Sequence, residues 1–135
     1  MSKFGDFDFE ELKDLQNNLG KMQDAYPRFV ESCLMELAGR LLAKTTARTP
    51  VGDTGDLRRG WTIGQIQRTG SQFEIEVINP VEYAKYVEYG HRTRDHKGWV
   101  EGRFMLTVSE DEIKRELPGI IERKMQKFMR QHLGW

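Results

Sequence analysis

Apolar residues recur every three or four positions near the start of the chain, which is the period of an amphipathic helix. The first such stretch runs from Phe7 to Met22, and a second follows Pro27 and continues the same period as far as Leu42. The second stretch predicts a central helix of roughly 20 residues. Pro50 disfavours helical geometry at Thr49, so we expect this helix to end near Arg48, whose charge suits a helix C-terminus.

The pattern turns helical again from Phe104 to the end of the chain. One apolar stripe is made by Ile113, Leu117, Ile121, Met125 and Phe128. Ser109 and Glu112 resemble a capping box, in which a hydroxyl and a carboxylate satisfy backbone amides at the start of a helix. Pro118 lies inside the stripe and is expected to kink or divide the helix, because proline lacks an amide donor.

The middle of the chain alternates with a period of two, as strands do. Trp61 to Gln67 and Phe73 to Ile78 read as strands of a β-hairpin, joined by a turn over residues 68–71. Asn79 has the character of a helix cap, and it predicts a short helix that carries three tyrosines and closes at Gly90. Residues 91–103 show no period and read as a long exposed loop, with an extended piece at Trp99 and Val100.

Together these elements predict an α+β fold. We expect a small antiparallel sheet, built on the 61–78 hairpin, to pack against the long central helix and the C-terminal helix. A length of 135 residues favours one domain that spans 1–135. No apolar run approaches the 18 residues of a membrane-spanning helix, and the single cysteine, Cys33, cannot form an internal disulfide.

The charges balance, with 21 Lys and Arg against 21 Asp and Glu. This balance argues against the broad positive field that non-specific binding of nucleic acid needs, so any contact with DNA has to be local. Arg92, Arg94, Lys97 and Arg103 surround Trp99, and a basic strip with an aromatic residue can hold a single strand. A nucleic-acid-binding module that uses Arg58, Arg59 and the 91–103 loop is therefore an alternative function.

Catalytic chemistry finds little support in the sequence. Glu88, His91, Asp95 and His96 have the residue types of a metal site, but the two histidines are five positions apart and fall on different faces of a helix. A metal-dependent hydrolase is a remote alternative. The serines lack a nucleophile context, and residues 52–55 read as a structural turn. We therefore expect no catalytic residue, no metal and no cofactor.

Tyrosines at three-residue steps precede the basic loop. Aromatic residues and arginine are the types enriched at the centres of protein interfaces. Tyr83, Tyr86 and Tyr89 stand directly before Arg92 and Arg94. This arrangement predicts a protein partner at least as well as it predicts a core.

Two segments together resemble a known family. TPVGDTGDLRR at residues 49–59 follows a long helix, and YAKYVEYG at residues 83–90 stands after a hairpin and before a loop. In this order the first and second signature segments resemble those of the tail-completion and head–tail joining proteins of tailed bacteriophages and prophages.

The resemblance implies a structural virion protein without catalysis. Such a protein forms or caps a ring, often a hexamer, at the head-proximal end of the tail, next to neck and tail-tube proteins and with double-stranded DNA passing through the lumen. It is assembled in the host cytoplasm and needs neither cofactor nor membrane. On this basis we expect contacts with other copies or with neighbouring proteins at Asp53, Thr54, Leu57, Arg58, Arg59, Tyr83, Tyr86, Glu88, Tyr89, Arg92, Arg94 and Trp99.

Overall fold

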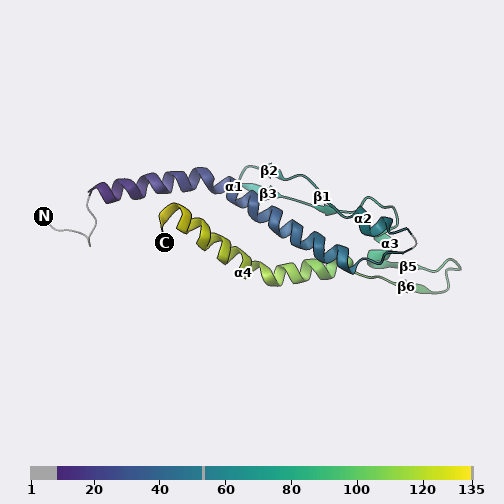
Figure 1. Ribbon diagram of the computed structural model, residues 1–135. Helices are drawn as coiled ribbons and strands as arrows, with labels where there is room; N and C mark the ends of the chain where they lie inside the picture. Colours follow the sequence, from purple (N-terminus) through teal and green to yellow (C-terminus); the bar gives the residue numbers. More distant parts are fainter. Residues whose placement is uncertain (1–8, 53, 135) are drawn as a thin grey trace. The chain divides into compact units, whose positions relative to one another are not determined.

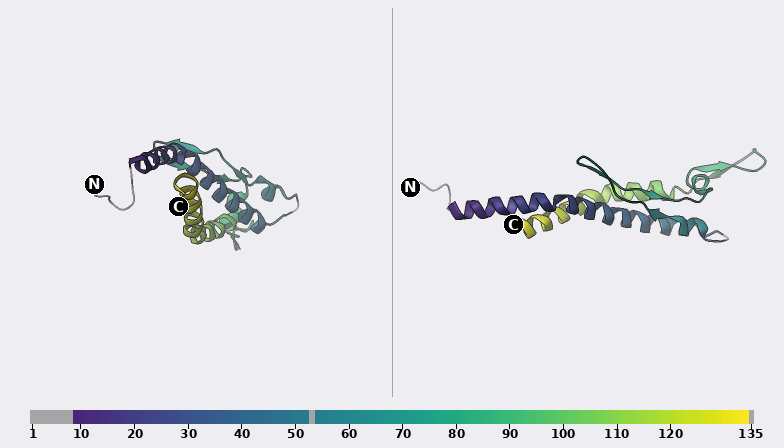
Figure 2. Two further views of the ribbon diagram at one scale, coloured as in Figure 1. Left: turned by 60° about the vertical axis from the view of Figure 1, so that its left-hand side comes forward. Right: turned by 90° about the horizontal axis from the view of Figure 1, so that it is seen from above.

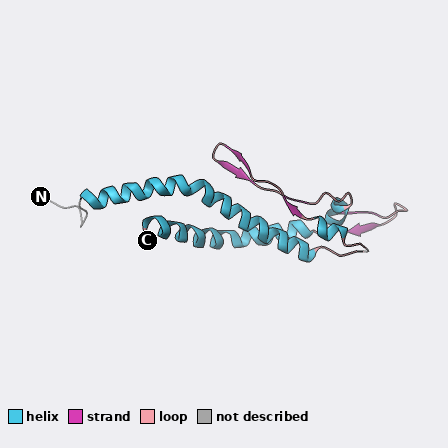
Figure 3. Cartoon of the chain, turned by 45° about the horizontal axis from the view of Figure 1, so that its top comes forward, coloured by secondary structure: helices cyan, strands magenta, loops and turns pink. Residues whose placement is uncertain are grey.

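The computed structural model describes residues 9–52 and 54–134, and these residues contain four helices and six short strands (Figure 1). The helices are α1 (Phe9–Arg48), α2 (Asp56–Gly60), α3 (Ala84–Tyr89) and α4 (Met105–Leu133). The strands are β1 (Thr62–Ile63), β2 (Gln67–Thr69), β3 (Gln72–Glu74), β4 (Val77–Ile78), β5 (Gly90–Arg92) and β6 (Trp99–Glu101). All six strands lie between the two long helices along the chain (Figure 3). The α+β prediction is confirmed.

The described residues form two compact units. One, the helical unit, contains residues 9–33 of α1 and residues 119–134, and the other, the mixed unit, contains residues 34–118. The prediction of a single domain over 1–135 stays a prediction.

Aromatic rings form the centre of the helical unit. Phe29 on α1 stacks on Phe128 of α4 with ring centroids 4.3 Å apart, and Tyr26 meets Phe128 edge-on at 6.5 Å. Cys33 is buried in the same unit, and this burial raises the pKa of its thiol. A buried thiol with a raised pKa is a poor nucleophile, so Cys33 is a packing residue of this unit.

Helix α1 is one continuous helix, whereas the sequence pattern predicted two, separated near Pro27. The helix runs through both Gly20 and Pro27 and ends at Arg48 as expected. A proline inside a helix costs about 3 kcal/mol. Here Tyr26 and Phe29, on either side of the proline, both contact the buried ring of Phe128, and these ring contacts offset part of that cost.

Helix α4 begins before its predicted cap, and Pro118 does not divide it. It begins at Met105, one turn before the predicted capping box, and it continues through Pro118 without division. Ser109 does not cap the helix, because its hydroxyl donates to the Met105 carbonyl, 2.6 Å away. The predicted stripe is confirmed, since every one of its members is buried or half-buried.

The predicted hairpin is present in the mixed unit as a long two-stranded ribbon. Strand β1 pairs with β4, and β2 pairs with β3, both antiparallel, with Thr69 opposite Gln72 at the turn. The alternation also holds: Phe73, Ile75 and Val77 are half-buried, and the glutamates between them are exposed.

The 91–103 segment is exposed as predicted, but it is a second hairpin and not a loop. Strand β5 pairs with β6, with His91 opposite Val100 and Arg92 opposite Trp99. The Thr93 amide donates to the Gly98 carbonyl across the turn at 3.0 Å. The sequence indicated only the extended piece at Trp99 and Val100. The pairing of β6 with β5 depends on the close approach of Gly90 to Gly102 at the base of the hairpin, which no local pattern in the sequence reports.

Asn79 has a different role from the predicted helix cap. Helix α3 starts five residues later, at Ala84. The Asn79 side chain accepts a hydrogen bond from the Val81 amide at 3.1 Å and donates one to the Leu57 carbonyl at 2.7 Å. It therefore ties the end of the first hairpin to α2.

Candidate protein–protein interface

The first signature segment connects α1 to α2 inside the mixed unit. Thr49 is buried, and its hydroxyl donates to the Thr45 carbonyl at 2.7 Å while it accepts from the Trp61 indole at 2.7 Å. Leu57 is only 3% exposed and belongs to the core. Both residues stabilise the unit, so they are not available to a partner.

Arg58 caps the C-terminus of α1. Its Nε donates to the Thr46 carbonyl at 3.0 Å, and its guanidinium also reaches the Ala47 carbonyl at 3.4 Å. The last carbonyls of a helix lack partners within the helix and carry a partial negative charge, so a guanidinium there is stabilising. The structure thus places Arg58 in a structural contact, where the sequence suggested an interface.

Thr54, Asp56 and Arg59 of this segment lie at the surface. Arg59 is exposed and bonds locally, to the Thr54 carbonyl and to the Asp56 carboxylate, both at 2.7 Å. The Thr54 hydroxyl accepts from the Asp56 amide at 3.2 Å. Asp53, the other predicted contact of this segment, lies outside the residues that the structure describes.

Glu88 in the second signature segment caps the N-terminus of α4. The carboxylate is 5% exposed, and it accepts hydrogen bonds from the amides of Leu106 at 2.9 Å and of Thr107 at 3.0 Å, and from the Thr107 hydroxyl at 2.8 Å. The first amides of a helix have no partner within the helix, and a negative charge there is favoured by the helix dipole. Glu88 therefore links α3 to the start of α4 inside the mixed unit.

Gly90 and Gly102 allow the chain to pass close to itself beside this cap. Gly90 has a φ of +87°, and a Cβ on Gly102 would collide with the backbone of Glu88 and Tyr89. The amides of Arg103 and Phe104 donate to the carbonyls of Val87 and Glu88, at 2.8 and 3.0 Å. Only glycine fits this approach, which fixes the base of the β5–β6 hairpin.

The aromatic residues around this anchored base point outward. Tyr83 directly before α3, Tyr86 and Tyr89 on α3 and Trp99 on β6 are all exposed, with Tyr86 at 58% and Trp99 at 56%. Such exposure excludes a core role for the tyrosines. Val100 and Phe104 are exposed as well, although sequence reasoning missed them. We call this set the aromatic surface: Tyr83, Tyr86, Tyr89, Trp99, Val100 and Phe104.

Arginines border the aromatic surface on the β5–β6 hairpin. Arg92 and Arg94 are exposed, and neither forms an ion pair with any residue that the structure describes. Six of the predicted contact residues are therefore exposed on the hairpin and at α3: Tyr83, Tyr86, Tyr89, Arg92, Arg94 and Trp99. Their arrangement, exposed rings beside unpaired guanidinium groups, is typical of a protein interface.

Two of the four candidate metal residues, Glu88 and Asp95, have other partners. Glu88 caps α4, and Asp95 accepts a hydrogen bond from the Thr93 hydroxyl at 2.6 Å, which lowers the pKa of its carboxyl. Over residues 9–52 and 54–134, no three His, Cys, Asp or Glu side chains gather as metal ligands would. In the same residues no helix combines the length and apolar character that crossing a membrane requires.

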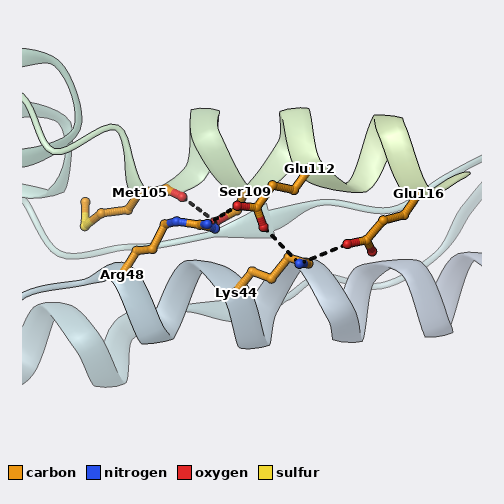
Figure 4. Close-up of polar contacts among 6 residues, drawn as sticks. All are labelled: Lys44, Arg48, Met105, Ser109, Glu112 and Glu116. Carbon is orange, nitrogen blue, oxygen red and sulfur yellow. Dashed lines mark hydrogen bonds and ion pairs between the residues drawn. The ribbon is translucent and has the colours of Figure 1, made fainter.

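A cluster of charges joins α1 to α4 in the mixed unit (Figure 4). Lys44 lies 2.9 Å from Glu112 and 3.1 Å from Glu116, and Arg48 pairs with Glu112. Arg48 also donates to the Ser109 hydroxyl at 2.9 Å. The hydrogen bonds from Lys44 and Arg48 lower the pKa of Glu112, and those from Lys44 to the two glutamates raise the pKa of Lys44.

We expect Glu112→Gln to destabilise the protein at neutral pH and to lose this effect in acid. A carboxyl whose pKa is lowered by folding stabilises the folded state above its unfolded pKa, and this stability disappears as the pH falls through the lower folded value. Urea denaturation of both proteins from pH 7 to pH 3 measures the difference. A difference that stays constant over this range would contradict the assignment, and Glu116→Gln, which removes only the Lys44 contact, is the milder control.

Residues 13–90 match the family model HK97-gp10_like, described as "Bacteriophage HK97-gp10, putative tail-component", over more than half of the chain. The chain belongs to the HK97-gp10-like family of bacteriophage tail components. This membership bears out the family resemblance seen in the two signature segments.

The HK97-gp10-like match contains both signature segments, with the cap residues Arg58 and Glu88, and ends at Gly90. The β5–β6 hairpin beyond Gly90 and the whole of α4 lie outside it. No curated protein and no solved structure matches the chain significantly. Membership in this family makes the protein a structural component of a phage tail, which interacts with other tail proteins.

Proposed function

We propose that this tail component self-associates into a ring, with six copies as the expected number, at the head-proximal end of the tail. There it completes the tail or joins it to the head, with neck and tail-tube proteins as neighbours. The double-stranded genome passes through the lumen without sequence-specific binding. The protein acts by its shape and its contacts and performs no reaction.

The aromatic surface is the observation that carries this proposal. Large exposed rings rarely gather on the surface of a soluble monomer without an interaction role. Tyrosine, tryptophan and arginine supply much of the binding energy in protein interfaces, and here they stand on α3 and on a hairpin whose base is fixed by Gly90 and Gly102. A rigid base lowers the entropic cost of ordering the contact.

The charge distribution supports a lumen that lets DNA slide. The chain carries no net charge, so the protein as a whole does not hold a polyanion strongly. The nucleic-acid-binding alternative loses one of its candidate residues, because Arg58 is bound to the carbonyls of α1, whereas Arg59 stays exposed in a local pair with Asp56. A gel shift with double-stranded DNA at physiological salt checks this point, and stable complexes would favour the alternative.

The proposed ring is tested by sedimentation and electron microscopy of the purified protein. We expect a discrete oligomer for the natural chain and a folded monomer for Tyr86→Ala combined with Trp99→Ala, because both exposed rings are lost. Met35→Ala removes an equally exposed apolar side chain from α1 and is the control that keeps the oligomer. A monomeric natural chain, or an oligomer that survives the double change, would contradict the proposal.

A further inference from the structure

An apolar groove lies in the mixed unit between the two long helices and the first hairpin. Its volume is about 490 Å³, within the range of sites that accept a ligand. The apolar part of its lining comes from α1, from residues 75–78 at β4 and from α4, with Leu34, Leu37, Ala38, Leu41, Ile75, Val77, Ile78 and Ile113. An apolar groove of this size can receive side chains from another protein surface.

The charges that line the groove are all negative. Glu76 from the first hairpin and Glu110 from α4 are its charged residues, and no lysine or arginine lines it. Among the described residues, neither carboxylate takes part in an ion pair. The groove therefore favours an occupant that combines apolar and positively charged side chains.

The β5–β6 hairpin has this combination. Trp99 and Val100 on β6 are exposed, and Arg92 and Arg94 lie on the same hairpin with unpaired guanidinium groups. The acidic group in the turn, Asp95, is held by the Thr93 hydroxyl and the Lys97 amide at 2.6 and 3.0 Å. The hairpin thus presents apolar side chains and free positive charge together.

The hairpin points away from the groove of its own chain. Within the mixed unit it extends away from the point where α1 ends and α4 begins (Figures 1 and 2). The helical residues that line the groove, from Leu34 to Leu41 on α1 and from Glu110 to Ile113 on α4, lie farther along both helices. The close approach of Gly90 and Gly102 holds the base of the hairpin in this direction. The matching surface must belong to another copy.

We infer that the β5–β6 hairpin of one copy docks into the Leu37–Ile78 groove of the next copy. Trp99 and Val100 enter the apolar part, and Arg92 and Arg94 meet Glu76 and Glu110. Two different surfaces then pair head to tail, and such a contact closes into a ring when its rotation allows. This inference rests on the proposed self-association and names the two surfaces that carry it.

Directed cross-linking tests the docking. Chains with Val100→Cys and chains with Ile78→Cys are expressed together and treated with a short bismaleimide, and each is also treated alone. We expect covalent dimers only from the mixture, and a ladder of higher oligomers from a chain that carries both changes. The natural chain is the control, because its Cys33 is buried and should not react.

Each other outcome has its own meaning. Cross-linking of Val100→Cys alone would show that hairpin meets hairpin, which overturns the inference. An intact oligomer by sedimentation without cross-links in the mixture would reject the docking and leave the proposed ring standing. Absence of any oligomer in the natural chain would reject the proposed function itself.

Charge reversal gives an independent measure. Arg92→Glu with Arg94→Glu should weaken self-association by about tenfold or more, because like charges would then face each other. Adding Glu76→Arg and Glu110→Arg to the same chain should restore it. Arg115→Glu, at an exposed position of α4 outside the groove, is the matched control and should change little. Failure of the added changes to restore association would contradict the pairing.

Discussion

Replacement of Glu88 by alanine should lower the free energy of unfolding by about 3 kcal/mol, a large fraction of the stability of a small protein. The carboxylate accepts three hydrogen bonds at the start of α4 while it is almost fully buried. Its loss leaves the amides of Leu106 and Thr107 without these partners and removes a negative charge that the helix dipole favours. Urea denaturation followed by circular dichroism measures the change.

Two variants make this test specific. Glu101→Ala removes an exposed carboxylate from β6 and should change stability by less than about 0.5 kcal/mol. Glu88→Gln keeps one acceptor oxygen and should fall between the natural protein and the alanine variant. If Glu88→Ala were as stable as Glu101→Ala, the capping role would be wrong.

Gly90→Ala should cost a similar amount, about 3 kcal/mol, for a different reason. A side chain at a φ of +87° is strained, and the new Cβ would also press on the backbone of Val100 and Gly102. Backbone atoms on both sides are held by hydrogen bonds of the hairpin, so they cannot shift cheaply. Thermal and urea denaturation of the variant measure the loss.

Gly70→Ala is the matched control for this prediction. Gly70 also has a positive φ, +62°, but a Cβ there meets no atom within 4 Å. This variant should therefore show only the conformational cost, about 1 kcal/mol. Equal losses for the two glycines would mean that the close approach of Gly90 to Val100 and Gly102 adds nothing to stability.

The sequence predicted those elements whose pattern is local. Pro50 indicated the C-terminal end of α1, the apolar period indicated the stripe of α4, and the alternation from Phe73 to Val77 indicated the first hairpin. These features depend on neighbours one turn or one strand away. Pattern reasoning therefore succeeds where the side chains that decide a structure are close along the chain.

Long-range contacts account for what the sequence did not predict. The continuity of α1 through Pro27 depends on contacts of Tyr26 and Phe29 with the ring of Phe128, about a hundred residues away. The start of α4 depends on Glu88, and the second hairpin depends on the approach of Gly90 to Gly102. No period in the sequence reports such pairs, so Ser109 resembled a cap and 91–103 resembled a loop.

The predicted contact residues fall into two groups, those with structural contacts inside the chain and those that stay exposed. The sequence analysis predicted that Arg58 and Glu88, like the tyrosines, contact a partner. The structure separates them, because Arg58 and Glu88 cap two long helices while Tyr86 and Trp99 stay exposed. The two signature segments thus hold the mixed unit together and present the aromatic surface from a fixed base.

Electron microscopy of particles made by a phage that lacks this protein tests the central claim most directly. If the protein completes or joins the tail at its head-proximal end, the lysate should contain DNA-filled heads beside separate tails, or tails of uncontrolled length. Separate tails of normal length would indicate joining, and uncontrolled lengths would indicate termination. Intact infectious virions in normal number would contradict the account.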